Sequence, residues 1–157
     1  MARFITHMPL ALAEARAASA RGEVPVGAVV TGPDGRVIAS AGNRTRELND
    51  PTAHAEILAI RAACAQTGSE RLPGHDLWVT LEPCPMCAAA ISAARIARLY
   101  FGADDQRMGG VDHGARVFDH AQCHHRPQIY SGLAAEPARL LLRDFFARKR
   151  RDDCRGT

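Results

Sequence analysis

Residues 76–103, DLWVTLEPCPMCAAAISAARIARLYFGA, decide the fold. The first six, DLWVTL, predict a short buried strand, and PMCAAAISAARIA at 85–97 predicts a helix. RLYFGA at 98–103 predicts a second strand. A strand followed by a helix and another strand is typical of a βαβ unit, in which the two strands run parallel. The stretch therefore predicts an α/β fold.

The rest of the chain supplies further helices and a hairpin. Two apolar runs around a Pro-Asp-Gly turn predict a β-hairpin at 26–41. Asp50 and Pro51 are typical of a helix start and Gly68 of a helix end. Residues 103–127 are rich in Gly and His, and we expect them to be irregular. Helices are predicted at 6–22, 51–68 and 137–151.

Length and composition predict one domain over residues 1–157, with 46% hydrophobic and 24% charged residues. No apolar run approaches the ~20 residues that cross a bilayer, so we expect no membrane span. His7, Pro9, Glu14 and Arg16 interrupt the N-terminal apolar stretch, which argues against a secretion signal. We therefore expect a cytoplasmic protein, whose five cysteines stay reduced.

His54, Cys84 and Cys87 are candidate metal ligands. Cys84 and Cys87 lie where a predicted strand turns into its helix, and His54 lies near the start of another helix. A helix N-terminus lowers the pKa of a thiol and so favours the thiolate that a metal binds. Two thiolates and one imidazole are typical of catalytic zinc, whose fourth position is left to water.

Two other interpretations of these residues stay open. His75 or Cys64 could supply a fourth protein ligand, which would make the zinc site a closed, structural one. Alternatively, the Cys-x-x-Cys pair could be a thioredoxin-like redox motif. A redox pair would leave His54 and Glu56 without a role.

Glu56 favours catalysis over both alternatives. In a regular helix, residues two apart point in different directions, so His54 and Glu56 would not both bind one metal. Near a helix end both can still reach the same cleft. Glu56 is then suited to carry protons for a water molecule activated by zinc.

The pattern H-x-E followed by P-C-x-x-C is the signature of zinc nucleoside deaminases. The sequence resembles, in order and spacing, the bacterial tRNA-specific adenosine deaminases of the cytidine/deoxycytidylate deaminase superfamily. The matching segments are EVPVGAVV, GNR, DPTAHAEILAIR, LWVTLEPCPMCAAAI, RIARLYFGA and LLRDFFARKRR. They run from about Arg21 to Arg151.

The resemblance implies a fold and an activity. The fold would be a three-layer α/β/α arrangement with a central five-stranded mixed sheet between helices. The activity would be the hydrolytic deamination of the wobble adenosine of a tRNA anticodon to inosine, by a homodimer with one Zn²⁺ per subunit. His54, Cys84 and Cys87 would hold the zinc, and Glu56 would shuttle protons. Asn43 would bind the substrate nucleoside, and the backbone around Ala55 would meet its base.

The C-terminal helix is a candidate contact for the anticodon stem-loop. From Arg139 onward the chain carries seven basic and three acidic residues, which favours a polyanionic partner. Basic side chains that stabilise the end of a helix explain the same pattern. Phe145 could stack on a base or pack in the core. The candidate RNA contacts are Arg126, Phe145, Arg148, Lys149 and Arg150.

Region 103–127 departs from the usual family pattern, because it lacks the Gly-Ser that follows the glycines and carries extra histidines. His120, Cys123 and His124 could bind a second metal, although surface or RNA-facing histidines explain them better.

Two other functions stay open for the chain. One is deamination of a free guanine- or cytosine-type base or nucleoside, and the other is a catalytically silent, zinc-bearing RNA-binding subunit.

Overall fold

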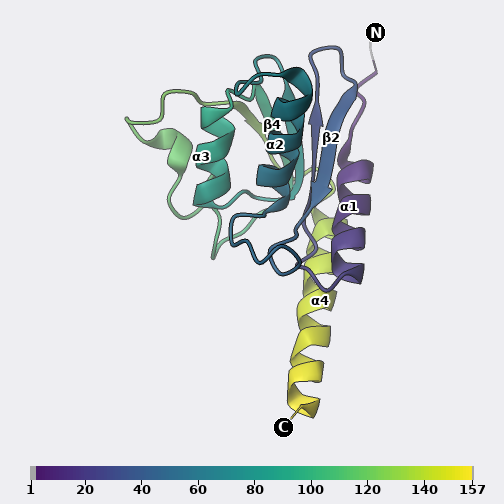
Figure 1. Cartoon of the computed structure of the whole chain (residues 1–157). Coiled ribbons are helices and arrows are strands. Elements are labelled where there is room, and N and C mark those ends of the chain that lie inside the picture. The colour runs from purple at the N-terminus through teal and green to yellow at the C-terminus, as the bar shows by residue number, and fades with distance from the viewer. Residues whose placement is uncertain (1–2, 157) are drawn as a thin grey trace.

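The computed structural model describes residues 3–156. Within them the chain forms four α-helices, a short 3₁₀ helix and five strands (Figure 1). The helices are α1 (Met8–Ala20), α2 (Ala55–Thr67), α3 (Pro85–Ala93), η1 (Val117–Asp119) and α4 (Ala135–Arg155). The strands are β1 (Gly27–Thr31), β2 (Val37–Gly42), β3 (Asp76–Leu81), β4 (Arg98–Ala103) and β5 (Gln128–Tyr130).

The five strands form one mixed sheet in the order β2-β1-β3-β4-β5. The hairpin partners β1 and β2 are antiparallel, as are β1 and β3. The pairs β3/β4 and β4/β5 are parallel, which confirms the βαβ unit predicted at 76–103. Helices α2 and α3 cover one face of the sheet, and α1 and α4 lie on the other (Figure 1). The predicted three-layer α/β/α fold is confirmed.

The core lies on both faces of the central strands. The residues of β1 and of β3 up to Thr80 are buried, which explains why their sequences are continuous apolar runs and do not alternate. Gly27 in β1 faces α1 so closely that a Cβ atom there would overlap the Ala11 carbonyl oxygen. The absence of a side chain at Gly27 therefore allows α1 to pack directly on the sheet.

Helix α2 begins four residues later than predicted. Asp50 and Pro51 form a turn in which the Thr52 N–H donates to Asp50 Oδ1 over 2.8 Å. His54 is the N-cap and has an extended backbone conformation. The predicted end is correct, because Gly68 takes a left-handed conformation with φ 71°.

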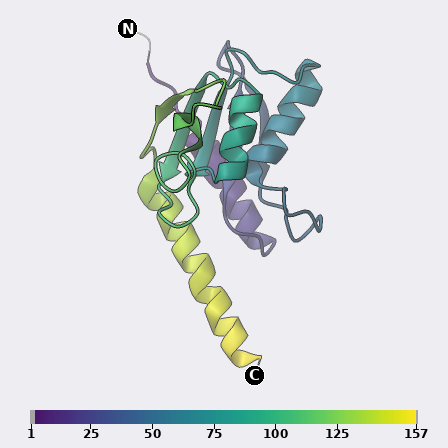
Figure 2. The same ribbon diagram turned by 90° about the vertical axis from the view of Figure 1, so that its left-hand side faces the viewer.

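The other boundaries differ in the same modest way. Helix α3 ends at Ala93 and not at residue 97, because Arg95 takes a left-handed conformation with φ 60° that a helix cannot contain. Helix α4 is longer than predicted, and its C-terminal half projects past the sheet (Figure 2). Strand β5 was not recognisable in the sequence.

No helix within residues 3–156 is long and apolar enough to cross a membrane.

Candidate zinc centre and catalytic cavity

Two helix N-termini bring the three candidate ligands together. His54 caps α2, Cys84 caps α3, and Cys87 lies in the first turn of α3. Their ligand atoms all lie within 4.8 Å of one another. His54 Nδ1 lies 3.6 Å from Cys84 Sγ and 3.4 Å from Cys87 Sγ. The predicted convergence of one imidazole and two thiols is therefore present in the fold.

These separations fit zinc. With Zn–S near 2.3 Å and Zn–N near 2.0–2.1 Å, tetrahedral angles place sulfur and nitrogen about 3.5 Å apart. The observed S···N distances of 3.6 and 3.4 Å bracket that value. The donor set is also one that favours zinc over hard cations such as magnesium. The three residues could hold a zinc ion without rearrangement.

No fourth His, Cys, Asp or Glu joins this group in the part of the chain that the structure describes. His75 Nδ1 instead lies 3.0 Å from the carbonyl of Pro73. Cys64 lies in the last turn of α2, at the opposite end of that helix from His54. Among the described residues the closed site with four protein ligands is therefore not formed, and a set of three protein ligands is typical of catalytic zinc.

Hydrogen bonds among the three candidate ligands shift the pKa values of their side chains. Hydrogen bonding with the Cys87 thiol lowers the pKa of Cys84 to about 4, despite the opposing effect of burial. The same Cys84 sulfur raises the pKa of His54 through its hydrogen bond. The pKa of Cys87 is raised, because its thiol donates to Cys84 and is buried. The lowered pKa of Cys84 favours its thiolate, the form in which a cysteine binds a metal.

Glu56 lies in the first turn of α2 and is 4% exposed. Burial raises the pKa of its carboxyl group, and hydrogen bonds from its own backbone N–H and from Cys87 only partly oppose this. A raised pKa makes the carboxylate a stronger base, which favours its taking a proton from a neighbouring group. Its position beside the ligands is therefore suited to proton transfer.

Asn43 links the end of β2 to the start of α2. Its Oδ1 accepts the Ala55 N–H over 2.8 Å, and its Nδ2 donates to the Val24 carbonyl over 3.2 Å. Both bonds fix the orientation of the amide at the edge of the cavity. Ala55 is buried, and its backbone N–H is bonded to Asn43.

One cavity of about 240 Å³ contains the predicted site. Its walls bring together His54, Glu56, Cys84 and Asn43, as predicted from the sequence. The sequence did not identify the remaining walls, although Glu82 immediately precedes the Pro-Cys motif. These remaining lining residues are Val24, Val26, Thr45, Leu81, Glu82, Asp105 and Met108.

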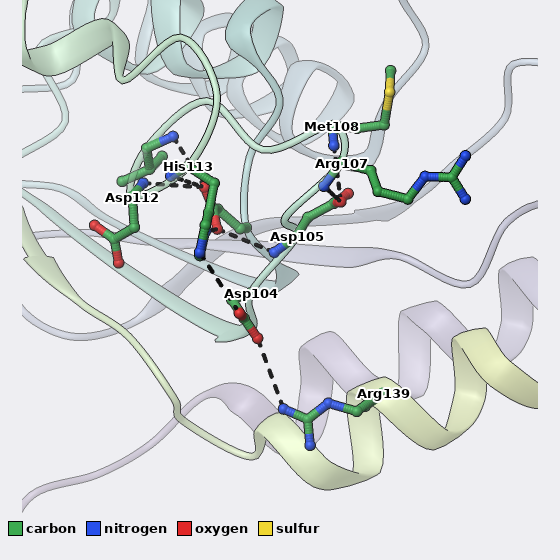
Figure 3. Close-up of polar contacts among 9 residues, drawn as sticks. Asp104, Asp105, Arg107, Met108, Asp112, His113 and Arg139 are labelled. Carbon is green, nitrogen blue, oxygen red and sulfur yellow. Dashed lines mark hydrogen bonds and ion pairs between the residues drawn. The ribbon is translucent and has the colours of Figure 1, made fainter.

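Glu82 is the second buried carboxylate of the cavity. It accepts hydrogen bonds from four backbone N–H groups and faces His113 Nδ1 at 2.8 Å (Figure 3). Burial alone would raise its pKa, but the bonds from His113 and from the backbone lower the pKa overall. Glu82 is therefore ionised and structural, whereas Glu56 has no comparable set of donors.

The candidate RNA contacts are spread over two surfaces. Arg126 is exposed and pairs with Asp119. In α4, Lys149 and Arg150 are exposed, and Arg148 donates to the Ser19 hydroxyl of α1 over 3.0 Å. The exposed basic side chains leave α4 available to a polyanion.

Phe145 is the exception among the candidate RNA contacts. It is 9% exposed and packs edge-on against Phe146, with ring centroids 5.4 Å apart. Core packing, the alternative left open for Phe145, accounts for it in this structure. Phe146, at 40% exposure, is the more accessible of the two rings.

The possible second metal site does not assemble. His120 Nε2 lies 2.8 Å from the Ala115 carbonyl, and the Cys123 thiol donates to the His125 carbonyl. Within residues 3–156, His54, Cys84 and Cys87 are the only group of three or more such residues whose atoms could hold an ion. His120 and His124 are exposed surface residues.

Comparison with known proteins identifies the family. The model of the cytidine and deoxycytidylate deaminase zinc-binding region matches residues 2–103. The chain is 63% identical to the tRNA-specific adenosine deaminase of Agrobacterium fabrum, over 94% of this chain and 97% of that one. This chain belongs to the tRNA-specific adenosine deaminase family. It is therefore a hydrolytic deaminase, and the resemblance inferred from its motifs is confirmed.

Two solved structures are similar to this chain. One, from studies of A-to-I editing by deaminases that act at the wobble position of transfer RNA, has a TM-score of 0.85 and 63% identity, covering 86% of this chain and 97% of the other. The guanine deaminase of Nitrosomonas europaea has a TM-score of 0.78 and 25% identity, covering 92% of this chain and 87% of that one. The tRNA-specific deaminase fold thus also occurs in enzymes that act on a free base.

Proposed function

We propose that this deaminase converts the wobble adenosine of a tRNA anticodon to inosine and releases ammonia. The observation that carries the proposal is that buried Glu56 lines one cavity with His54 and Cys84, which form a group of candidate ligands with Cys87. The 63% identity to a tRNA-specific adenosine deaminase supports RNA as the substrate. We propose one zinc ion per chain, which the one group of three candidate ligands within residues 3–156 supports, and metal analysis of the purified protein tests that ratio.

The protein's own groups supply the proton transfers. Zinc held by His54, Cys84 and Cys87 would act as a Lewis acid that lowers the pKa of the attacking water to about 7. Glu56 accepts a proton from that water and delivers it to the purine ring nitrogen beside the reacting carbon. The water oxygen bonds to carbon 6, and the exocyclic nitrogen leaves as ammonia after a further proton transfer through Glu56.

The raised pKa of Glu56 suits both halves of this cycle. A carboxylate of ordinary pKa would return a proton readily but would be a weak base for removing one from water. Burial raises the pKa, which makes the carboxylate a stronger base for the first transfer and the protonated acid easier to form for the second.

The cavity can receive a base only if the base leaves its stack. Unstacking costs least in a single-stranded loop, which favours an anticodon loop over a duplex. Asn43 would bind the nucleoside, and the backbone at Ala55 would meet the base, as the resemblance implies. The exposed basic residues of α4 and Arg126 would hold the phosphate backbone, which attracts cations irrespective of sequence.

We also propose that the enzyme is a cytoplasmic homodimer, on the strength of the resemblance to its family. Analytical ultracentrifugation at micromolar concentration tests this part directly. A mass of two chains is expected, and a mass of one chain would contradict it.

Deamination of a free purine base is the second candidate function. The likeness to a guanine deaminase, with a TM-score of 0.78, favours it. Salt separates the two candidates. Because RNA binding depends on counterion release, kcat/KM on an anticodon stem-loop should fall steeply with added salt. Turnover of free guanine that is indifferent to salt would instead support the free-base enzyme.

A further inference from the structure

The segment 104–113 forms one wall of the catalytic cavity. It follows directly after β4 and contributes Asp105 and Met108 to the cavity lining. The segment has no regular secondary structure, so no ladder of backbone hydrogen bonds fixes its position. Its attachment to the fold must come from other contacts.

Glu82 supplies most of those contacts, beside the backbone bond from the Gly110 N–H to the Pro83 carbonyl over 2.8 Å. Its Oε1 accepts the Asp105 N–H over 3.1 Å. Its Oε2 accepts the N–H groups of Val111, Asp112 and His113 over 3.0–3.2 Å. The Glu82 side chain is fully buried, so these bonds replace the water that an ionised carboxylate needs. One carboxylate therefore ties both ends of the wall to the strand that leads into the zinc ligands.

His113 supplies the side-chain hydrogen-bond donor to Glu82. Its Nδ1 lies 2.8 Å from Glu82 Oε1, and its Nε2 lies 3.9 Å from Asp104 Oδ2. Asp104 lies 3.8 Å from Arg139 of α4, and Figure 3 shows the three residues in a row. The two outer contacts are long and partly exposed, so they contribute little. The contact between His113 and Glu82 is the strong one.

The wall is also packed tightly against Glu82. A Cβ atom at Gly109 would overlap both the Asp105 carbonyl oxygen and the Glu82 carboxylate. The segment therefore lies as close to Glu82 as a polypeptide backbone allows. A Glu82 carboxylate that turned away would release the hydrogen bonds to the wall and move Asp105 and Met108.

We infer that His113 is a positioning residue of this deaminase. By holding the Glu82 carboxylate in one orientation, it fixes the cavity wall formed by Asp105 and Met108, so that a nucleoside meets a preformed site. This inference rests on the proposed function for its substrate. It concerns the region that departs from the family's usual pattern, where His113 stands three residues beyond the glycine pair.

The kinetic test compares three zinc-loaded variants on an anticodon stem-loop. His113→Leu removes the donor, His113→Gln keeps one, and Asp112→Asn is the matched control. The carboxylate of Asp112 points away from the other labelled residues in Figure 3. We expect His113→Leu to raise KM about ten-fold, as for loss of a charged hydrogen bond that organises a site, with kcat per bound zinc nearly unchanged. His113→Gln should restore most of the loss.

A merely structural role predicts a different pattern. In that case His113→Leu would lower the melting temperature and the fraction of zinc-loaded enzyme, while KM stayed at the wild-type value. That outcome would overturn the inference. An equal rise in KM for Asp112→Asn would also overturn it, because the effect would then belong to any change in the segment.

Hydrogen exchange provides a readout that is independent of the substrate. Backbone amides of Asp105, Val111 and His113 should exchange faster in His113→Leu than in the wild type, and Asp112→Asn should leave them unchanged. Unchanged exchange in His113→Leu would contradict the inference, whatever the kinetics show. If the wild-type enzyme forms no inosine, the proposed function fails, and the exchange measurement still decides whether His113 holds the wall.

Discussion

Glu56 and Glu82 line the same cavity, but the pKa values of their carboxyl groups are shifted in opposite directions. Burial dominates at Glu56 and raises its pKa. At Glu82, hydrogen bonds from His113 and the backbone overcome burial and lower the pKa. One carboxyl group can therefore exchange protons with a substrate, while the other stays ionised and holds the cavity wall.

Glu56→Gln should retain zinc and the fold but lose catalysis. The amide is nearly the same size as the carboxyl group, and Glu56 is not among the three ligand residues. Loss of a general acid–base group lowers rates by about 10²–10⁴-fold. Inosine formation, metal content and thermal unfolding should be measured on the same preparation. Activity within a few-fold of wild type would rule out Glu56 as the proton shuttle.

Gly27→Ala should destabilise the fold away from the catalytic site. The added methyl group would overlap the Ala11 carbonyl oxygen, so α1 would have to move from the sheet. Such overpacking costs about 1–3 kcal/mol. Urea unfolding measures the change in the free energy of unfolding. Gly156→Ala, where the nearest atoms would lie 3.8 Å away, is the control, and an equal effect of both substitutions would contradict the packing argument.

Stability should depend on pH through His113. Its hydrogen bond with Glu82 raises its pKa above the ordinary value of 6.5, and Asp104 and Asp112 add to this shift. The stabilisation from protonated His113 is therefore complete below about pH 6.5 and is lost as pH rises through the folded-state pKa. The stability difference between wild type and His113→Gln should be larger at pH 6 than at pH 9. Urea unfolding at both pH values checks this, and an equal difference at both would contradict it.

The basic end of α4 should contribute to RNA affinity and not to chemistry. Replacing Arg148, Lys149 and Arg150 together by alanine should raise KM on the stem-loop and leave kcat almost unchanged. Each lost phosphate contact should reduce the slope of log(kcat/KM) against log[salt] by about 0.7–1. An unchanged slope would show that the RNA backbone binds elsewhere. Arg139→Ala, at the start of the same helix, is the matched control.

The sequence predicted those parts of the protein that depend on local patterns. The βαβ unit follows from two apolar runs around a helical one, and the zinc ligands follow from spacing and residue type. Glu56 could be separated from the ligands because helical geometry turns it away from His54. In each case the deciding information lies within a few residues along the chain.

Features that depend on distant contacts were not predictable. Strand β5 has three residues and owes its existence to pairing with β4. The bond between His113 and Glu82 joins residues 31 positions apart, and no spacing rule connects them. The start of α2 was misplaced because Asp50 and Pro51 are equally suited to a turn. These features required the tertiary structure.

The central claim is tested most directly by inosine formation on an anticodon stem-loop with adenosine at the wobble position. Free adenosine, guanine and cytidine serve as parallel substrates for the zinc-loaded enzyme. The proposed function predicts inosine on the stem-loop and negligible turnover of the three small molecules. Efficient turnover of a free base with none on the stem-loop would contradict the RNA assignment, and no turnover of any substrate would indicate a catalytically silent subunit.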